Sequence, residues 1–231
     1  MSARECETSV RLIQSCERVI RRSRRFSDVT VRAIAAEAGV AASSVSHHFG
    51  SLEDLVAATA MDAYRRLNAE RLTALQAEID RRRPEAPGLA GVLAALVGPS
   101  IRWSLDPESR YRVFTYMHGL ATLSDRPGRF ARMTESLDHH RAFIRQLRRI
   151  APWFDEGEIG WRVNAVLGVR SQITRHRARS RLLAGGGVGR DDPEALIERI
   201  VEVSAPMFAR PEPPGSRTPF GARHAAVGES L

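Results

Sequence analysis

Lysine is absent from the sequence, and all 35 basic residues are arginine. Cysteine is scarce as well, since only Cys6 and Cys16 occur, ten residues apart on one predicted helix and without a Cys-X-X-Cys spacing. Ten residues of helix span about 15 Å, whereas a disulfide needs Cα atoms within about 7 Å. Both cysteines are therefore expected to be free thiols, and a disulfide framework is excluded.

Long apolar runs are also missing. No stretch of about 18 apolar residues occurs, and the first ten residues carry acidic side chains where a signal peptide needs an apolar segment. We therefore expect no membrane span and a cytoplasmic protein. The composition, 43% hydrophobic and 27% charged, is typical of a globular chain, and 231 residues allow one large domain or two ordinary ones.

The net charge of +8 is compatible with a nucleic-acid partner, but its distribution weakens that argument. Residues 1–50 carry eight arginines against five acidic residues, whereas residues 141–181 carry ten against three. Most of the positive excess thus lies outside the segment interpreted below as DNA-binding. The arginines Arg175, Arg177, Arg179 and Arg181 precede a glycine-rich loop and are expected to be solvated.

Apolar residues recur at three- and four-residue steps almost throughout, and no stretch shows the sustained two-residue alternation of a strand. The sequence therefore predicts an all-α fold, with an N-terminal three-helix unit joined by one long helix to a C-terminal helical domain. The expected domains are residues 1–51, 52–209 and a disordered tail, 210–231. Expected helices span residues 7–23, 30–38, 42–49, 52–82, 88–105, 107–124, 127–151, 155–180 and 192–209.

Residues 30–49 have the residue types of a helix-turn-helix. Thr30 can cap a short helix that ends at Ala38-Gly39, because glycine readily adopts the left-handed conformation of a tight exit. The seam between the two helices is expected to hold Ile34, Ala35, Ala38, Val40 and Val45. Small and hydrogen-bonding residues are then left to face outward, as a helix that enters the major groove requires, namely Ala42, Ser43, Ser44, Ser46 and His47.

The stretch from Arg11 to Leu55, with T-V-R-A-I-A-A-E-A-G-V followed by H-F-G-S-L-E-D-L, resembles the N-terminal domain of TetR-family repressors. The resemblance implies a homodimer, DNA contacts from the helix at 42–49, and a C-terminal domain that binds a small molecule. The implied function is a repressor that a small hydrophobic effector releases from its double-stranded DNA operator.

Three positions depart from the family pattern. Family members usually carry Ser or Thr at the position of Ala41, often an aromatic at Ser46, and often a lysine at Leu52. The cap of the reading helix is therefore expected from Ser43 or Ser44 instead.

Phosphate contacts must also come from other residues, since the aliphatic Leu52 cannot donate a hydrogen bond. We expect Arg32 and His47 to hold the DNA backbone, with Ser46 and the arginine cluster at 21–25 as further candidates. That cluster is equally well interpreted as a solvated helix end. Ser43 and Ser44 are expected to lie nearest the bases.

Residues 89–180 mix large apolar side chains with isolated polar ones, which suits either a small-molecule cavity or an ordinary core. We expect the effector to bind among Trp103, Phe114, Met117, His118 and Trp161.

The helices near 155–180 and 192–209 are expected to form a four-helix interface between two copies, as the resemblance implies. Packing of both helices inside one chain is the alternative. The candidate interface residues are Val163, Leu167, Ile197, Ile200, Val201 and Ser204.

Nothing in the sequence supports an enzyme or a cofactor. It has no glycine-rich phosphate loop, nucleophile-elbow serine or metal-ligand spacing. The adjacent pairs His47-His48 and His139-His140 point about 100° apart on a helix, which does not suit one metal ion. A helical small-molecule-binding protein with weak or lost DNA binding is the alternative function.

Overall fold

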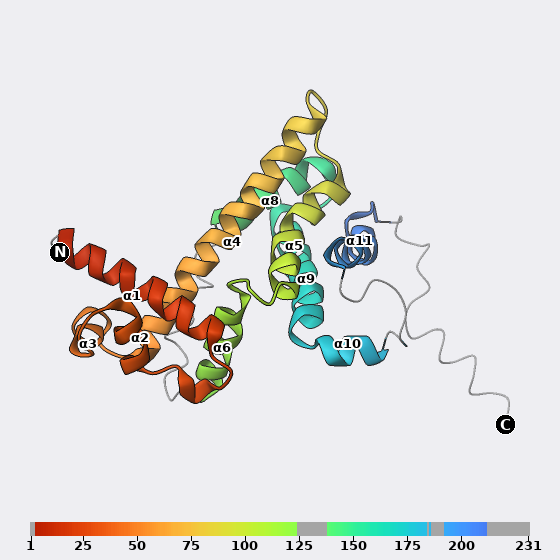
Figure 1. Cartoon of the computed structure of the whole chain (residues 1–231). Coiled ribbons are helices and arrows are strands. Elements are labelled where there is room, and N and C mark those ends of the chain that lie inside the picture. Colours follow the sequence, from red (N-terminus) through yellow and green to blue (C-terminus); the bar gives the residue numbers. More distant parts are fainter. Residues whose placement is uncertain (1–2, 124–137, 184, 186–191, 212–231) are drawn as a thin grey trace.

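The computed structural model describes residues 3–123, 138–183, 185 and 192–211 (Figure 1). Helices are the only regular elements within these ranges, which confirms the all-α prediction. None of the described helices is long and apolar enough to cross a membrane. Residues 212–231 of the predicted tail and residues 127–137 of a predicted helix lie outside the described residues.

The first three helices form a small lobe, here called the head. They pack around one apolar cluster in which Leu12, Ile34 and Val45 are fully buried. Cys16 lies in the same cluster as a free thiol, and burial raises the pKa of this thiol to about 12. The elements of the head are α1 (Ala3–Arg22), a 3₁₀ turn (Phe26–Asp28), α2 (Val31–Ala38) and α3 (Ser43–Phe49).

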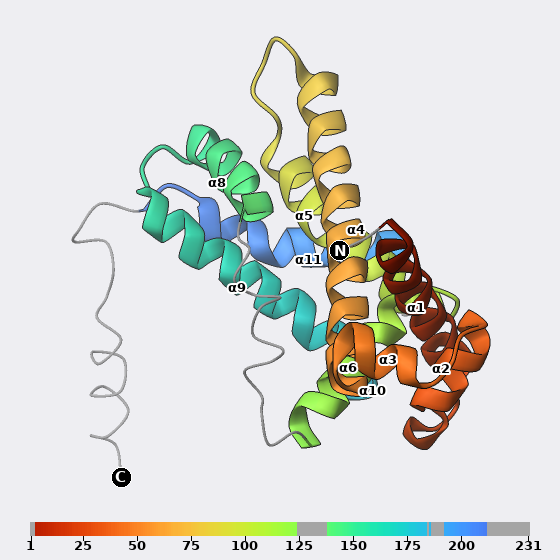
Figure 2. The same ribbon diagram turned by 90° about the vertical axis from the view of Figure 1, so that its left-hand side faces the viewer.

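One long helix, α4 (Leu52–Arg82), runs from the head to the far end of the molecule, and α5 (Leu89–Leu105) returns beside it (Figures 1 and 2). Ser51 caps α4, because its Oγ accepts the N–H of Asp54 at 3.1 Å. The early turns of α4 pack in the head cluster, whereas Leu75 packs in the core of the second lobe. The helix is therefore shared by both lobes.

The second lobe, here called the body, packs the later helices against α4 and α5. Its core is apolar and includes the fully buried side chains of Leu96, Phe143 and Ile159, one each from three helices. The remaining elements are α6 (Tyr111–Leu123), α8 (Asp138–Ile150), α9 (Glu156–Arg175), α10 (Arg177–Leu183), α11 (Pro193–Ser204) and a 3₁₀ turn (Ala205–Phe208).

The predicted single helix over 155–180 is wrong, because the chain breaks at His176. There the backbone leaves the helical region, with φ −115° and ψ 43°, and α10 starts in a new direction (Figure 1). Likewise α6 begins at Tyr111 rather than 107, after a turn in which the N–H of Ser109 binds the Asp106 carbonyl at 3.1 Å. Helical periodicity continues across both breaks, so periodicity alone does not reveal them.

The residues predicted for a dimer interface lie mostly inside one chain. Four of them are buried in the body, three as members of its apolar core. Leu167 and Val201 are half-buried beside the same core. The amphipathic stripes of α9 and α11 are thus accounted for by packing against α5 and each other. The four buried residues are Val163, Ile197, Ile200 and Ser204.

Candidate functional site

The helix-turn-helix of the head has the local geometry that its sequence predicts. Thr30 Oγ1 accepts the N–H of Ala33 at 3.1 Å and so caps α2. Gly39 ends that helix in the left-handed region, with φ 64°. The N–H of Val40 then reaches back to the Ala35 carbonyl at 3.0 Å. These contacts fix the angle at which α3 leaves the turn.

One face of α3 is open to solvent. Ser43, Ser46 and His47 follow one another at three- and four-residue spacing and are all exposed. Ala42 and, on α2, Arg32 are exposed as well. Ser44 is half-buried, which makes it the one predicted DNA-contacting residue that is partly withdrawn from solvent.

The predicted side-chain cap of α3 is not formed. Ala42 occupies the N-cap position, and no side chain accepts a hydrogen bond there. The helix starts instead on backbone bonds, the first from the N–H of Ser44 to the Ala41 carbonyl at 3.0 Å. The hydroxyl groups of Ser43 and Ser44 are therefore not used to begin the helix.

Two of the four arginines in the cluster at residues 21–25 form ion pairs, and Arg18, one turn earlier on α1, forms another. Glu37 of α2 accepts hydrogen bonds from Arg18 at 2.7 Å and from Arg22 at 2.5 Å, and these bonds lower the pKa of its carboxyl. Arg21 lies 3.6 Å from the carboxylate of Glu108, just before α6. Of the cluster, Arg24 and Arg25 are left exposed at the surface.

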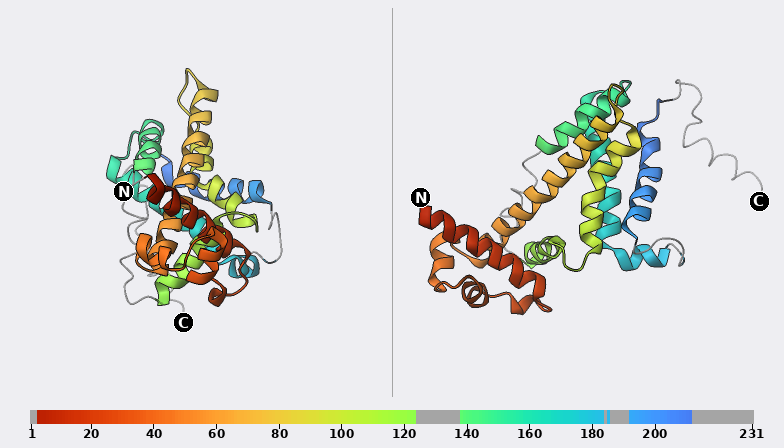
Figure 3. Two further views of the ribbon diagram at one scale, coloured as in Figure 1. Left: turned by 60° about the vertical axis from the view of Figure 1, so that its left-hand side comes forward. Right: turned by 45° about the horizontal axis from the view of Figure 1, so that its top comes forward.

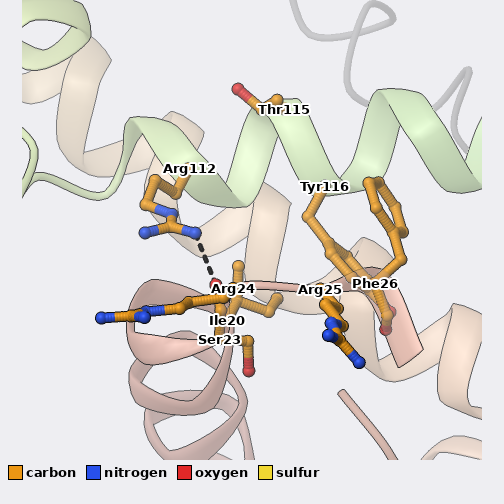
Figure 4. Close-up of a pocket in the computed structure, with 8 residues that line it drawn as sticks. All are labelled: Ile20, Ser23, Arg24, Arg25, Phe26, Arg112, Thr115 and Tyr116. Atoms are coloured by element: carbon orange, nitrogen blue, oxygen red, sulfur yellow. Dashed lines mark hydrogen bonds between the residues drawn. The ribbon is translucent and has the colours of Figure 1, made fainter. Parts of the chain in front are cut away.

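The head meets the body at α6, in a contact here called the junction (Figure 4). Phe26 stacks on Tyr116 with ring centroids 4.5 Å apart and planes at 16°. Arg112 donates a hydrogen bond to the Ser23 carbonyl at 2.5 Å. A small pocket of about 130 Å³ lies among these residues. Because Met117 of α6 is itself buried in the head cluster, one side of α6 packs into the head.

A larger cavity, here called the α6 cavity, has a volume of about 520 Å³. This is within the range of about 300–1,000 Å³ that small-molecule sites occupy. Its apolar wall contains Trp103 and Phe114, whose rings stack at 6.4 Å, and Tyr111, which meets Phe114 edge-on at 5.8 Å. The lining residues are Trp103, Ser104, Asp106, Pro107, Tyr111, Arg112, Phe114, Thr115, His118, Thr174, Arg175, Arg177 and Ala178.

Three of the five residues predicted to bind the effector line this cavity, namely Trp103, Phe114 and His118. Met117 does not, because its side chain points into the head cluster. Trp161 does not either, since it stands 67% exposed on α9. The sequence predicts both as cavity residues because they are large and apolar. Size and polarity do not show which side of a helix a residue faces.

Three arginines of the cavity wall, Arg112, Arg175 and Arg177, were not predicted as part of it. Arg175 donates a hydrogen bond to Nε2 of His118 at 2.7 Å, so this nitrogen acts as the acceptor of a neutral imidazole. Partial burial and the charge of Arg175 both lower the pKa of His118, which favours the same neutral form. Arg177 reaches the wall from the first residue of α10, which is possible because α9 ends at Arg175.

Two family models match the chain. The one described as bacterial regulatory proteins, tetR family, matches residues 23–59, and thus covers the helix-turn-helix. The one described as tetracyclin repressor-like, C-terminal domain, matches residues 94–206, and thus covers the helices around the α6 cavity. No curated protein matches the sequence.

Solved structures share the arrangement of both lobes. The multidrug binding protein EbrR, in complex with imidazole, has a TM-score of 0.53 and 19% identity, covering 89% of this chain and 97% of its own. A protein of Pseudomonas aeruginosa PAO1 assigned as a transcriptional regulator has a TM-score of 0.56 and 20% identity, covering 87% and 93%. At such identities the likeness establishes the fold.

Proposed function

The chain belongs to the TetR family of DNA-binding transcriptional regulators, and on this premise we propose that it is a cytoplasmic, ligand-responsive repressor. A small molecule in the α6 cavity would release it from its operator. The observation that carries the proposal is that one helix, α6, both lines the cavity and packs into the head. A ligand that shifts α6 therefore acts directly on the DNA-binding lobe.

The exposed face of α3 is proposed to enter the major groove. Its hydroxyl and imidazole groups, at Ser43, Ser46 and His47, can donate to or accept from base edges and phosphates. Arg32 is exposed on the neighbouring helix and is proposed to hold a phosphate. Ser44 is half-buried, so less of its side chain is available for contact with the DNA than that of Ser43.

Two copies are proposed to act together as a homodimer. Two reading helices about 34–36 Å apart can meet successive major grooves on one face of the duplex, which one head cannot do. On α9 and α11 the large apolar side chains that stay exposed are Trp161, at 67%, and Val203, at 50%. These two, rather than the buried residues predicted from the stripes, are the candidates for contact with a partner copy.

The effector would act through a difference in affinity. A ligand shifts a conformational equilibrium only by as much as it binds one arrangement better than the other. Here the ligand-bound arrangement would move α6 and, through the Phe26–Tyr116 stack, tilt the head and α4. The separation of the two reading helices would then no longer match the DNA.

A helical small-molecule-binding protein without DNA recognition is the second candidate. It is favoured by two observations at the reading helix: α3 has no side-chain cap, and Leu52 offers no hydrogen-bond donor at the start of α4. Specific binding to DNA separates the two candidates.

Replacing Arg32 with alanine is expected to weaken DNA binding by a similar factor for all sequences. It should also lower the dependence of log Kd on log salt by about 1, because one phosphate contact and its released counterion are lost. The measurement is a fluorescence-anisotropy titration, at several salt concentrations, of fragments next to the protein's own gene and of random DNA.

The matched control is Arg179→Ala, which removes an exposed arginine from α10. This variant should show the same dependence of log Kd on log salt as the parent protein. If the parent protein bound own-gene and random fragments equally, the second candidate function would be favoured instead.

A further inference from the structure

In the body, α8 packs against both α4 and α9 (Figure 2), and each of these two helices brings a positively charged side chain to this region. Arg71 of α4 is only 2% exposed, and a guanidinium nitrogen donates to Asn68 Oδ1 at 2.8 Å. Arg170 of α9 is close enough for its charge to lower the pKa of Arg71. Burial is the larger cause of that shift, and the resulting pKa of about 10 leaves Arg71 charged at neutral pH.

These two charges have no acidic partner among the described residues. The Nε atoms of Arg71 and Arg170 are buried without a hydrogen-bond acceptor in the part of the chain that the structure describes. The Asn68 amide oxygen, which accepts the hydrogen bond of Arg71, is uncharged. Buried arginines in proteins are normally paired with an anion, because desolvating an unpaired charge is costly.

Two neutral histidines add hydrogen-bonding groups to the same region. The rings of His139 and His140, in the first turn of α8, lie 3.9 Å apart. Burial, their mutual proximity and the nearby arginines hold the pKa of His140 at about 3, while burial and Arg71 hold that of His139 at about 4. Nε2 of His139 lies 3.2 Å from the Tyr64 hydroxyl, whereas Nε2 of His140 is buried without a partner.

Tyr111 connects this cluster with the α6 cavity. Its side chain lines the cavity, and it lies close enough to Arg170 to raise the pKa of that guanidinium. On α4, Leu67 lies one turn before Arg71 and packs with Trp103 and Phe114 of the cavity wall. The cavity wall itself carries Arg112, Arg175 and Arg177 against a single acidic residue, Asp106. The cavity and the cluster behind it therefore share a strong excess of positive charge.

We propose that the effector is an organic anion, with a carboxylate or phosphate group that binds Arg71 and Arg170 and an apolar body that lies against Trp103 and Phe114. The planar guanidinium fork matches either group, and a bound anion would supply the missing acceptors. This inference rests on the proposed function of the α6 cavity. The sequence predicts a small hydrophobic effector, and the inference adds that this effector carries a negative charge.

The test compares four probes that share one apolar body and differ in charge: octanoate, octyl phosphate, 1-octanol and octylamine. Each is added to the full-length protein, without DNA, and the thermal unfolding midpoint is followed. An anion that binds only the folded protein should raise the midpoint by about 3–6 °C at ten times its Kd. Octanol should need a concentration at least about tenfold higher for the same rise, and octylamine should give none.

Comparison of octanoate with octyl phosphate shows which anionic group fits better. The proposal is overturned if octanol matches the anions, if octylamine does, or if neither anion raises the midpoint.

The variant Arg170→Gln keeps a polar side chain but removes one charge. It should abolish the preference for anions over octanol, and it should raise the midpoint of the free protein, since a buried unpaired charge is lost. Arg71→Gln, on α4, should have the same two effects on the anion preference and on the unfolding midpoint. It provides an independent measurement if Arg170→Gln does not fold. The control Arg145→Gln, exposed on α8, should behave like the parent.

If the control lost the preference as well, or if both cluster variants kept it, the anion would not be bound by these arginines. Because the assay contains no DNA, it tests binding of the anion separately from the effect of the anion on operator binding. An anion that binds without changing operator affinity leaves the site in place and overturns the proposed effector role.

Discussion

Replacing Ser43 and Ser44 together with alanine is expected to weaken binding to the operator by about 10- to 100-fold and to relax its sequence preference. Loss of base contacts in the major groove costs about 1–3 kcal/mol for each good contact. The structure adds a reason to expect a clean result. Neither serine caps α3, and alanine is the better helix former, so the helix should stay intact.

The matched control is Ser27→Ala, which removes an exposed serine from the 3₁₀ turn of the same lobe. It should bind operator and random DNA as the parent does in the anisotropy titration. If the double variant kept both affinity and sequence preference, α3 would not read the bases through these serines. The exposed pair Ser46 and His47 would then be the remaining candidates on that face.

Replacing Phe26 with alanine is expected to separate DNA binding from its control by the effector. The Phe26 ring stacks on Tyr116 at 4.5 Å and forms the aromatic contact of the junction (Figure 4). Without the ring, a movement of α6 is transmitted less to the head. The packing of the reading helix α3 is unchanged, because Phe26 is not part of it. We expect operator affinity within about threefold of the parent and a loss of most of the effector response, which in allosteric proteins is about 5- to 150-fold.

Trp153→Ala provides the control for this experiment, because Trp153 is a similarly exposed aromatic residue, 42% against 46% for Phe26, in the turn between α8 and α9. It should respond to the effector like the parent. If Phe26→Ala responded in the same way, the signal would not pass through the stack, and α4, which is shared by both lobes, would be the route to test next.

The head could be predicted almost completely from sequence because its determinants are local. A capping threonine, a glycine at the turn and a short apolar seam each act over a few residues, and Thr30, Gly39 and Val45 have the predicted roles. His48, in the last turn of α3, lies against α1, with Nδ1 3.1 Å from Ser9 Oγ. The missing cap of α3 is the exception, since a serine inside the first turn can face either way.

The site in the body could not be predicted in the same way, because it depends on which helices become neighbours. The spacing of apolar residues on α9 and α11 is the same whether they pack within one chain or between two. Arg71 lies four residues from both Leu67 and Leu75, on the buried side of α4, whereas the exposed Arg66 does not. This spacing indicates burial but does not show which side chains surround Arg71. Only the packing of α8 against both α4 and α9 brings it close to the charge of Arg170.

The junction escaped prediction for a related reason. Tyr116 and Met117 alternate along α6 with the cavity residues Phe114 and His118, so the segment looks like one mixed apolar stretch. In the folded chain its two sides serve two lobes, as Figure 3 shows for the position of α6 between α1 and α5. A helix with two apolar sides is a sign of such a position, but it does not identify the partner on each side.

The most direct test of the central claim is operator affinity measured with and without a bound effector. DNA from next to the protein's own gene would be titrated with the full-length chain at fixed salt, with octanoate or octyl phosphate either absent or at ten times its Kd. We predict tight, sequence-selective binding that the anion weakens by about 5- to 150-fold. An anion that binds the protein and leaves operator affinity unchanged would contradict a ligand-responsive repressor.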